Sequence, residues 1–216
     1  MIDLLIDLDN TVYPETSEIF SQIDKKMKEF ISKNLNVDLE EAFRIQKKYF
    51  KENGTTLRGL MLHNKIKPAP FLKFVHDIDL SSLKKNNQLK KFLKNYTGKK
   101  IIFTNGTKEH AYNVLKRVSI LEEIDFIYDI ENANYIPKPN KVTYNKLLSK
   151  FNLVPKNTAM LDDIPINLKT AKELGIKTIL IKKGLEKKRK FDYIDIFSDN
   201  ILQGLFKLNK RESYEN

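Results

Sequence analysis

Hydrophobic residues near the start of the chain change from one continuous run to a helical spacing. The apolar run at residues 4–6 is short and is followed at once by acidic residues, which predicts a buried strand. From residue 15 to residue 96 the apolar positions recur three or four residues apart, which predicts consecutive helices and no strand. The apolar stripe of the first helix comprises Ile19, Phe20, Ile23, Met27, Phe30 and Ile31.

Further helices in this part are marked by their end signals. Asp38 and Glu41 have the spacing of a capping box and predict the start of a second helix, which ends near Asn53 and Gly54. Apolar spacing predicts shorter helices over residues 55–63 and 69–77 and another over residues 86–96.

The pattern changes again after residue 98, where short β-rich runs alternate with helical segments. The predicted strands lie within residues 99–105, 126–130, 158–163 and 177–183, with one more at residues 192–197. The predicted helices cover residues 108–118, 141–152 and 166–174, followed by one through Leu202, Leu205 and Phe206. Residues 209–216 are polar, and we expect them to form a frayed tail.

Alternating strands and helices are typical of a parallel sheet, so we predict an α/β fold. Its core is formed by residues 1–14 and 97–216. Residues 15–96 then form a second, helical domain that is inserted directly after the first strand. This domain begins within a few residues of a pair of aspartates at the end of that strand.

Composition narrows the class of protein. The 216 residues include no cysteine, which excludes disulfides and cysteine metal sites. Apolar runs are too short to cross a membrane, and the first residues lack the pattern of a signal peptide, so we expect a cytoplasmic protein. The net charge of +11 comes from lysines spread along the chain, and the densest group, residues 182–190, is expected to be a solvated loop. We therefore expect no specific nucleic-acid binding, although a basic surface would attract small anionic substrates.

Polar residues gather where the predicted strands end. The first strand leads into Asp7 and Asp9, the second into Thr104-Asn105, and a later one into Asp162-Asp163. Lys138 lies between two prolines at the start of a helix. Because ligands bind at the carboxyl ends of parallel strands, these side chains are expected to meet at one edge of the sheet.

This set of side chains suits phosphoryl transfer. The carboxylates of Asp7 and Asp162 can hold Mg²⁺, and a carboxylate is a competent nucleophile toward phosphorus. Asp9 is placed to transfer protons. Thr104 can bind phosphoryl oxygens, and Lys138 can neutralise negative charge. Each feature alone also has an ordinary structural explanation, because Asp and Asn are common in turns and at helix caps. The four features together, in this order, favour the catalytic interpretation.

The motifs "DLDNT" at residues 7–11, "FTNGT" at 103–107, "KP" at 138–139 and "LDD" at 161–163 resemble the four signature motifs of the haloacid dehalogenase-like superfamily. The resemblance covers nearly the whole chain, with the helical insertion at the position of the C1 cap of that superfamily. It implies a Rossmann-like core and Mg²⁺-dependent phosphoryl transfer through an aspartyl-phosphate.

The resemblance also implies a role for each motif residue. Asp7 is the expected nucleophile and Asp9 the general acid and base. The remaining implied roles are phosphate binding by Thr104, Asn105 and Lys138, metal binding by Asp7, Asp162 and the main-chain carbonyl of Asp9, and support by Asp163 and Asn167. For Asn167 an exposed position on a helix is an equally good explanation.

Residues 7–14 and the segment around Asn53–Leu60 resemble the pyrimidine 5′-nucleotidase group of this superfamily, as does "TN" followed by His110-Ala111. The expected substrate is therefore a pyrimidine nucleoside monophosphate such as UMP or CMP. Arg58 and His63 in the cap and Tyr13 near the hinge are the candidates for contacting base or ribose. For each of the three, a surface or packing role is the alternative.

Other activities fit the same core motifs. A phosphatase for sugar phosphates or phosphoglycolate, and a phosphomutase, would use the same residues around the phosphate. Dehalogenation is disfavoured, because it needs no acid two residues after the nucleophile. A catalytically silent binding protein is the non-enzyme alternative. The expected assembly is a monomer or a homodimer.

Overall fold

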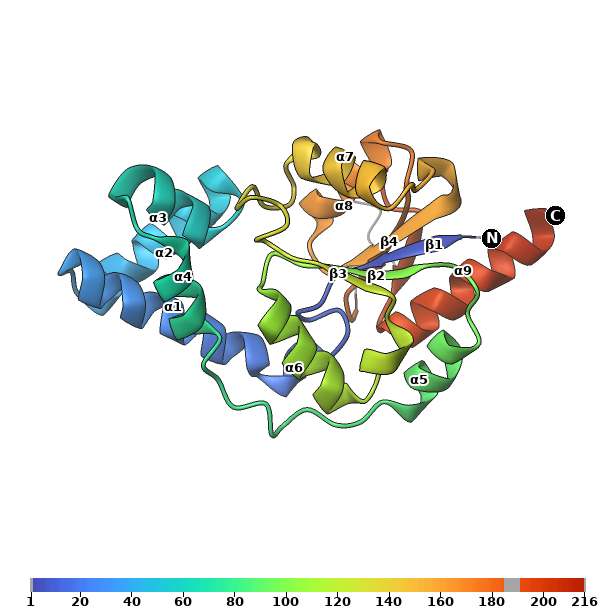
Figure 1. Cartoon of the computed structure of the whole chain (residues 1–216), viewed down its shortest axis with the longest axis horizontal. Coiled ribbons are helices and arrows are strands. Elements are labelled where there is room, and N and C mark those ends of the chain that lie inside the picture. Colours follow the sequence, from blue (N-terminus) through green and yellow to red (C-terminus); the bar gives the residue numbers. More distant parts are fainter. Residues whose placement is uncertain (1, 185–190, 216) are drawn as a thin grey trace.

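The computed structural model describes residues 2–184 and 191–215, and over these residues it contains a six-stranded sheet (Figure 1). Every pair of neighbouring strands runs parallel, which confirms the predicted α/β fold. The strands are β1 (Asp3–Ile6), β2 (Lys100–Phe103), β3 (Phe126–Tyr128), β4 (Thr158–Asp162), β5 (Lys177–Ile181) and β6 (Ile196–Ser198).

The strand order is β3-β2-β1-β4-β5-β6, so β1 lies at the centre of the sheet. The chain builds outward from β1 through β2 to β3, and then returns to the other side of β1 to form β4, β5 and β6. The order therefore reverses between β1 and β4. In open α/β sheets, the carboxyl ends of the strands on either side of such a point border the ligand-binding crevice.

Alternate residues of the strands face two separate hydrophobic layers. Leu4 and Ile6 of β1 belong to a cluster under α5 (Asn87–Lys94), α6 (Lys108–Val118) and α9 (Ile201–Glu215). Leu5 belongs to the opposite cluster, under α7 (Lys141–Lys150) and α8 (Pro165–Glu173). Figure 1 shows these two groups of helices on opposite faces of the sheet. The continuous apolar run of β1 follows from this arrangement, because both faces are covered.

A third cluster joins four helices beside the sheet, namely α1 (Ile19–Leu35), α2 (Leu39–Asn53), α3 (Thr56–Asn64) and α4 (Pro68–Val75). The predicted cap signals are present: the Asp38 side chain accepts a hydrogen bond from the Glu41 N–H at 2.8 Å, and α2 ends at Gly54 with φ of 82°. Phe30 of α1 and Phe71 of α4 pack edge to face with ring centroids 5.1 Å apart. These helices form a unit with its own hydrophobic core at the open edge of the sheet (Figure 1).

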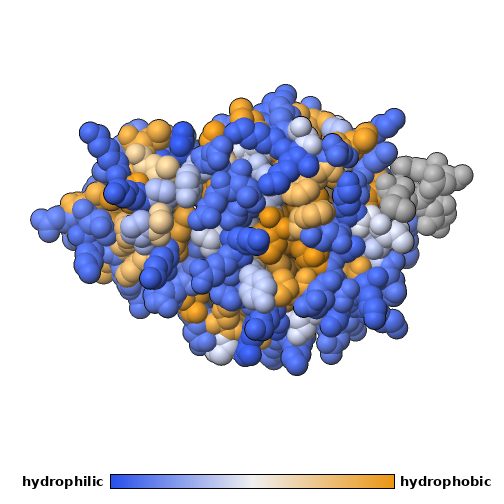
Figure 2. Space-filling model, in the orientation of Figure 1, coloured by the Kyte–Doolittle hydropathy of each residue, from blue (hydrophilic) through white to orange (hydrophobic). Residues whose placement is uncertain are grey.

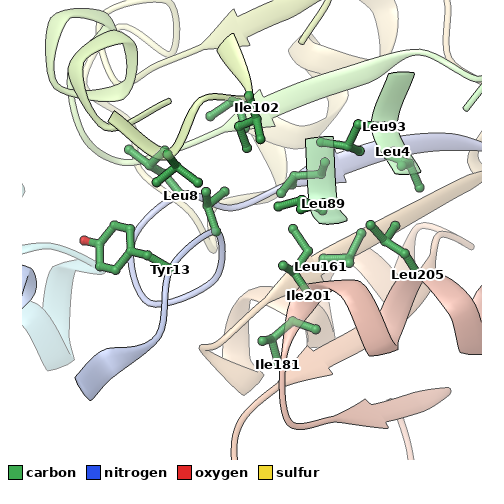
Figure 3. Packing of buried hydrophobic residues seen from close by; sticks show 14 of the residues in the cluster. Leu4, Leu8, Tyr13, Leu89, Leu93, Ile102, Leu161, Ile181, Ile201 and Leu205 are labelled. Atoms are coloured by element: carbon green, nitrogen blue, oxygen red, sulfur yellow. The ribbon is translucent and has the colours of Figure 1, made fainter. Parts of the chain in front are cut away.

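The helix α5 lies within the predicted cap range of 15–96 but packs on the sheet. Leu89 and Leu93 of α5 face the strands beside Leu4 (Figure 3). Phe92 of α5 also packs edge to face against Phe206 of α9, with centroids 5.3 Å apart. We therefore propose that the cap consists of α1 to α4 and that α5 belongs to the core.

Two predictions near the end of the chain need correction. The helix α9 extends to Glu215, through most of the segment expected to be a frayed tail. The last strand is Ile196–Ser198 and begins later than the predicted run, because residues 192–193 form a turn before it. Most of the basic segment 182–190 lies outside the described residues, so its prediction as a solvated loop stays a prediction.

The surface agrees with the composition. Hydrophilic residues cover most of the face seen in Figure 2, and hydrophobic residues gather mainly near its centre. In the described part of the chain, no helix combines the length and the apolar character needed to span a membrane.

Candidate active site

The candidate active site lies where β1, β2 and β4 end, between the sheet and the cap helices. A cavity of about 290 Å³ opens there. Its core side is lined by Asp7, Asp9, Thr104, Lys138 and Asp163, and its cap side is mostly apolar. The fold thus brings the four sequence motifs to one cavity, as the strand ends predict.

Lys138 is the centre of the charged network. Its Nζ donates to Asp7 Oδ1 at 2.7 Å and to Asp162 Oδ2 at 2.8 Å. The Lys138 side chain is 1% exposed. Burial opposes its charge, but the neighbouring Asp162 and Asp7 carboxylates outweigh this effect and raise the pKa of Lys138 above its usual range. Lys138 is therefore a fixed cation between two carboxylates.

Asn105 holds the main chain of this lysine. Its Oδ1 accepts from the Lys138 N–H at 2.8 Å, and its Nδ2 donates to the Lys138 carbonyl at 3.3 Å. Both polar atoms of the side chain thus contact the Lys138 backbone, although the family resemblance implied that Asn105 binds phosphate. In this structure the side chain of Asn105 positions the loop that carries Lys138.

Asp162 and Asn167 form a buried pair behind the lysine contact. Asp162 is 0% exposed and accepts at Oδ1 from the Ile164 N–H at 2.8 Å. Asn167 Nδ2 lies 3.0 Å from Oδ1 and 3.1 Å from Oδ2 of the same carboxylate. Asn167 is buried, so the alternative of an exposed helix amide is wrong. Both oxygens of Asp162 thus accept hydrogen bonds within the buried network.

Three carboxylates could hold a metal ion. Asp7, Asp162 and Asp163 offer oxygens that all lie within 4.8 Å of one another. Asp7 and Asp163 line the cavity, whereas Asp162 does not. Asp162, an expected ligand, thus belongs to this carboxylate cluster, and Asp163, expected to act at a distance, also belongs to it and faces the cavity.

The electrostatics of this cluster favour a bound cation. Burial and the charges of Asp162 and Asp163 raise the pKa of Asp7 well above its usual range, and Lys138 offsets this only in part. Burial and the Asp162 charge raise the pKa of Asp163 to about 7. A hard cation with oxygen ligands, such as Mg²⁺, would relieve this repulsion, so the donor set fits the expected metal.

Two side chains, those of Tyr13 and His110, hold Asp9 in place. The sequence motifs did not connect either of them with Asp9. Its Oδ1 accepts from the Tyr13 hydroxyl at 2.5 Å and lies 2.8 Å from His110 Nε2. Burial opposes ionisation of Asp9, but the charge of His110 and the hydrogen bonds from His110 and Tyr13 lower its pKa overall. Its Oδ2 has no hydrogen-bond partner among the described residues. Asp9 therefore has one fixed oxygen and one oxygen free for proton transfer.

Tyr13 has a packing role rather than the predicted contact with a base. It is 3% exposed and belongs to the hydrophobic cluster under the sheet. Figure 3 shows its ring at the edge of that cluster, with the hydroxyl pointing away from the other residues. Because this hydroxyl meets Asp9, Tyr13 supports the site through Asp9.

The loop after β2 provides main-chain and hydroxyl groups beside the carboxylates. The Thr104 side chain is buried, and its Oγ1 accepts from the Gly106 N–H at 2.9 Å. Thr107 caps α6, with its Oγ1 accepting from the His110 N–H at 3.2 Å. This turn from strand to helix is a suitable place for phosphoryl oxygens.

The site contains two histidines, His76 and His110, for which the sequence patterns predicted no functional role. His76 follows α4 in the cap and lines the cavity. Its ring stacks on that of His110, with centroids 4.4 Å apart and an angle of 6° between planes. The chain has three histidines, and a search for polar residues near the start of α6 would have found His110. No local signal distinguishes His76.

The two cap residues that were predicted to contact substrate lie elsewhere. His63 is exposed and stacks on Tyr49, with centroids 5.1 Å apart, and it does not line the cavity. Arg58 is half-buried and lines a neighbouring outer groove, together with Gly54 and Asn105. His63 and Arg58 thus both lie outside the lining of the cavity, and Arg58 lies in a neighbouring groove.

Comparison with known families agrees with this geometry. A family model described as haloacid dehalogenase-like hydrolase matches residues 4–175. The chain is 25% identical over 230 residues to "Glyceraldehyde 3-phosphate phosphatase" of Methanocaldococcus jannaschii, and the match covers 96% of each chain.

A yeast protein and a solved structure are also similar. "Phosphate metabolism protein 8" of Saccharomyces cerevisiae is 28% identical over 192 residues, which cover 81% of this chain and 59% of the yeast protein. The chain thus spans less than two thirds of that relative. The crystal structure of a HAD phosphatase from Thermococcus onnurineus superposes with a TM-score of 0.63 at 18% identity, covering 97% of this chain and 98% of the other. This last likeness shows a shared fold.

Proposed function

The chain belongs to the haloacid dehalogenase-like hydrolases, and from this premise we propose that it is a Mg²⁺-dependent phosphomonoester hydrolase that forms an aspartyl-phosphate. The observation that carries the proposal is the contact of Lys138 with Asp7, with Asp9 two residues away and partly free. This arrangement joins a candidate nucleophile, a fixed positive charge and a proton-transfer group in one cavity. A phosphatase among the relatives supports the same class of reaction.

Asp7, Asp162 and Asp163 are the residues that would hold Mg²⁺, with the main-chain carbonyl of Asp9 as a further ligand that the family resemblance implies. Bound Mg²⁺ supplies charge neutralisation for the phosphoryl group. Asp162 also accepts a hydrogen bond from Lys138, so it connects the metal site with the fixed positive charge.

The chemistry has two steps. In the first, a carboxylate oxygen of Asp7 attacks phosphorus, the bond from phosphorus to the leaving oxygen breaks, and Asp9 in its protonated form, which the second step regenerates, gives its proton to that oxygen. In the second, Asp9 takes a proton from a water molecule that attacks the same phosphorus, which releases inorganic phosphate and restores Asp7. Lys138 stabilises the negative charge in both steps.

The leaving group faces the cap. There the cavity is lined mainly by apolar side chains: Phe20, Ile23, Met27, Phe50, Leu57, Phe71, Leu72 and Val75. The one lysine on this side, Lys47, is paired with Asp24 at 2.7 Å. An uncharged leaving group with an apolar face suits this environment. This supports the pyrimidine nucleoside of UMP or CMP and disfavours phosphoglycolate, whose leaving group is anionic.

A small sugar phosphate is the second candidate substrate. It is favoured by the relative from Methanocaldococcus jannaschii that is named glyceraldehyde 3-phosphate phosphatase, because the match covers nearly all of both chains. The core residues would act in the same way, and only the contacts with the cap would differ.

The test is phosphate release from a panel of phosphomonoesters, with Mg²⁺ and with chelator. The panel contains UMP, CMP, AMP, GMP, glyceraldehyde 3-phosphate, other sugar phosphates and phosphoglycolate. We expect Mg²⁺-dependent release that is fastest with UMP and CMP. Preference for glyceraldehyde 3-phosphate would show that the substrate is a sugar phosphate and not a nucleotide, while the proposed reaction would stand. Absence of release from every compound would overturn the hydrolase and favour a mutase or a silent binding protein.

A further inference from the structure

His76 is an unusual residue at the boundary of cap and core. It lies directly after α4, yet it lines the cavity together with Asp7, Thr104 and Gly106 of the core. A methyl group placed on Gly106 would lie 3.6 Å from His76 Nε2 and 3.3 Å from Thr104 Oγ1. The Nε2 atom of this cap residue is therefore close to the loop that is expected to bind phosphate.

The hydrogen bonds around His76 are the basis for assigning the proton to one of its ring nitrogens. The Thr107 Oγ1 lies 3.3 Å from His76 Nδ1 and accepts from the His110 N–H at 3.2 Å. Because this hydroxyl already accepts one hydrogen bond, we assign it as the donor to Nδ1. The proton of a neutral His76 ring is then on Nε2, the atom beside Gly106.

The ring is neutral at ordinary pH. Burial and the neighbouring His110 lower the pKa of His76 to about 3. Its Nε2 has no hydrogen-bond partner in the part of the chain that the structure describes. A neutral ring with one satisfied nitrogen and one free N–H is a hydrogen-bond donor that awaits an acceptor.

We propose that His76 is a substrate-binding residue supplied by the cap, whose Nε2–H donates to an oxygen of the phosphate ester. The inference rests on the proposed phosphomonoester hydrolysis. The stack of His76 on His110 orients the donor. The same stack places a cap residue against the side chain that holds Asp9. The donor contacts the ester group and not the rest of the leaving group, so its effect is the same for different substrates.

Three substitutions separate the donor from the stacked ring. His76→Phe keeps a stacked ring and removes the donor, His76→Gln keeps a donor near the position of Nε2 and removes the ring, and His76→Ala removes both. His63→Phe is the matched control, because His63 is also a stacked cap histidine but lies outside the cavity.

The activity measurement is hydrolysis of p-nitrophenyl phosphate and CMP with Mg²⁺, with thermal unfolding of each variant. We expect His76→Phe to lower kcat/KM about 10- to 100-fold on both substrates, as for a lost hydrogen bond to a charged group, with an unchanged unfolding temperature. His76→Gln should recover part of the loss, and His63→Phe should match the wild type. Activity of His76→Phe equal to the wild type would overturn the donor role.

A binding measurement separates this inference from the proposed function. Titration calorimetry with inorganic phosphate and Mg²⁺ should show weaker binding for His76→Phe than for the wild type and for His63→Phe. If the wild type hydrolyses nothing, the proposed function fails, while this binding difference still tests His76. Equal phosphate affinities of the wild type and His76→Phe would contradict the inference directly.

Discussion

The two sides of the cavity are built differently. On the core side the charged groups are buried and joined to each other: Lys138 is 1% exposed, and both of its carboxylate partners belong to the sheet edge. On the cap side the lining is mostly apolar and more open, with Phe20 37% and Phe50 45% exposed. The comparison indicates that the core holds its reactive geometry before substrate arrives, whereas the cap provides shape and apolar contact.

The difference has a physical reason. Buried charges are tolerated only when each has a partner, so a charged site in a sheet core must be a connected network. Apolar surface needs no specific partner and can be rearranged by movement of a whole cap. We therefore expect substitutions on the core side to change chemistry and stability strongly, and substitutions at the contacts between cap and core to have smaller effects.

The largest effect is expected for Asp7→Asn. This change removes the nucleophile but retains a side chain of the same shape, so hydrolysis should fall by about 10³-fold or more. The fold should remain, because burial and the neighbouring carboxylates already disfavour the charge of Asp7. Phosphate release and circular dichroism test both statements. Asp9→Asn should also lose turnover but retain the nucleophile, and an active Asp7→Asn protein would refute the covalent mechanism.

Lys138→Met tests the connected network on the core side. Removing the lysine leaves Asp7 and Asp162 buried without their cation, and we expect the free energy of unfolding to fall by about 3–5 kcal/mol. Urea denaturation measures this change. The control is Lys172→Met, which breaks the more exposed pair with Asp195 and should cost about 1 kcal/mol or less. Similar losses in the two variants would show that the buried network contributes no more to stability than a more exposed ion pair does.

Gly54→Ala tests a contact between cap and core. Gly54 has φ of 82°, and a Cβ there would lie 3.1 Å from the Lys138 carbonyl oxygen. Alanine should cost about 1–2 kcal/mol of stability from the backbone alone, and the close contact should also displace the loop of Lys138 and lower activity about 10-fold. Gly175→Ala is the control, because Gly175 also has φ of 82° but only a 3.8 Å neighbour. It should lose stability and keep activity.

The smallest effect concerns pH and the cap histidine. The pKa of His76 is lowered to about 3 in the folded protein, against about 6.5 for an unfolded chain. Between these two pKa values the unfolded chain binds more protons than the folded protein does. The contribution of His76 to the free energy of unfolding is therefore fully present above pH 6.5 and decreases as the pH falls through this window.

Urea denaturation at pH 7 and pH 5 measures this component. His76→Phe has no titrating group at this position, so on acidification it should lose about 1–2 kcal/mol less than the wild type does. Equal losses would mean that the ring is not held neutral by the fold.

Local patterns predicted the framework well. The runs that became β2, β3, β4 and β5 were identified because buried strands are short and β-rich, and the helix caps at Asp38 and Gly54 follow from side-chain and backbone chemistry within a few residues. The end of the chain was less predictable, since polarity alone does not prevent a helix such as α9 from continuing.

The convergence of Asp7, Thr104, Lys138 and Asp163 on one cavity also followed from the sequence, because carboxyl ends of parallel strands share one edge. The partners within that cavity did not follow. That Asn105 holds the backbone of Lys138 is visible only in the contacts between loops that are 33 residues apart in the chain.

The sequence by itself thus determined the class of fold, the order of the motifs and the residue types needed for phosphoryl transfer. Only the tertiary structure decided that Asp163 rather than Asp162 faces the cavity, and that His76 rather than His63 lies at the phosphate loop. Neighbouring aspartates carry the same local signal, and both histidines lie at or near the ends of short helices. Their roles differ because burial and contact are set by how distant segments pack together, and periodicity along one segment carries no information on that packing.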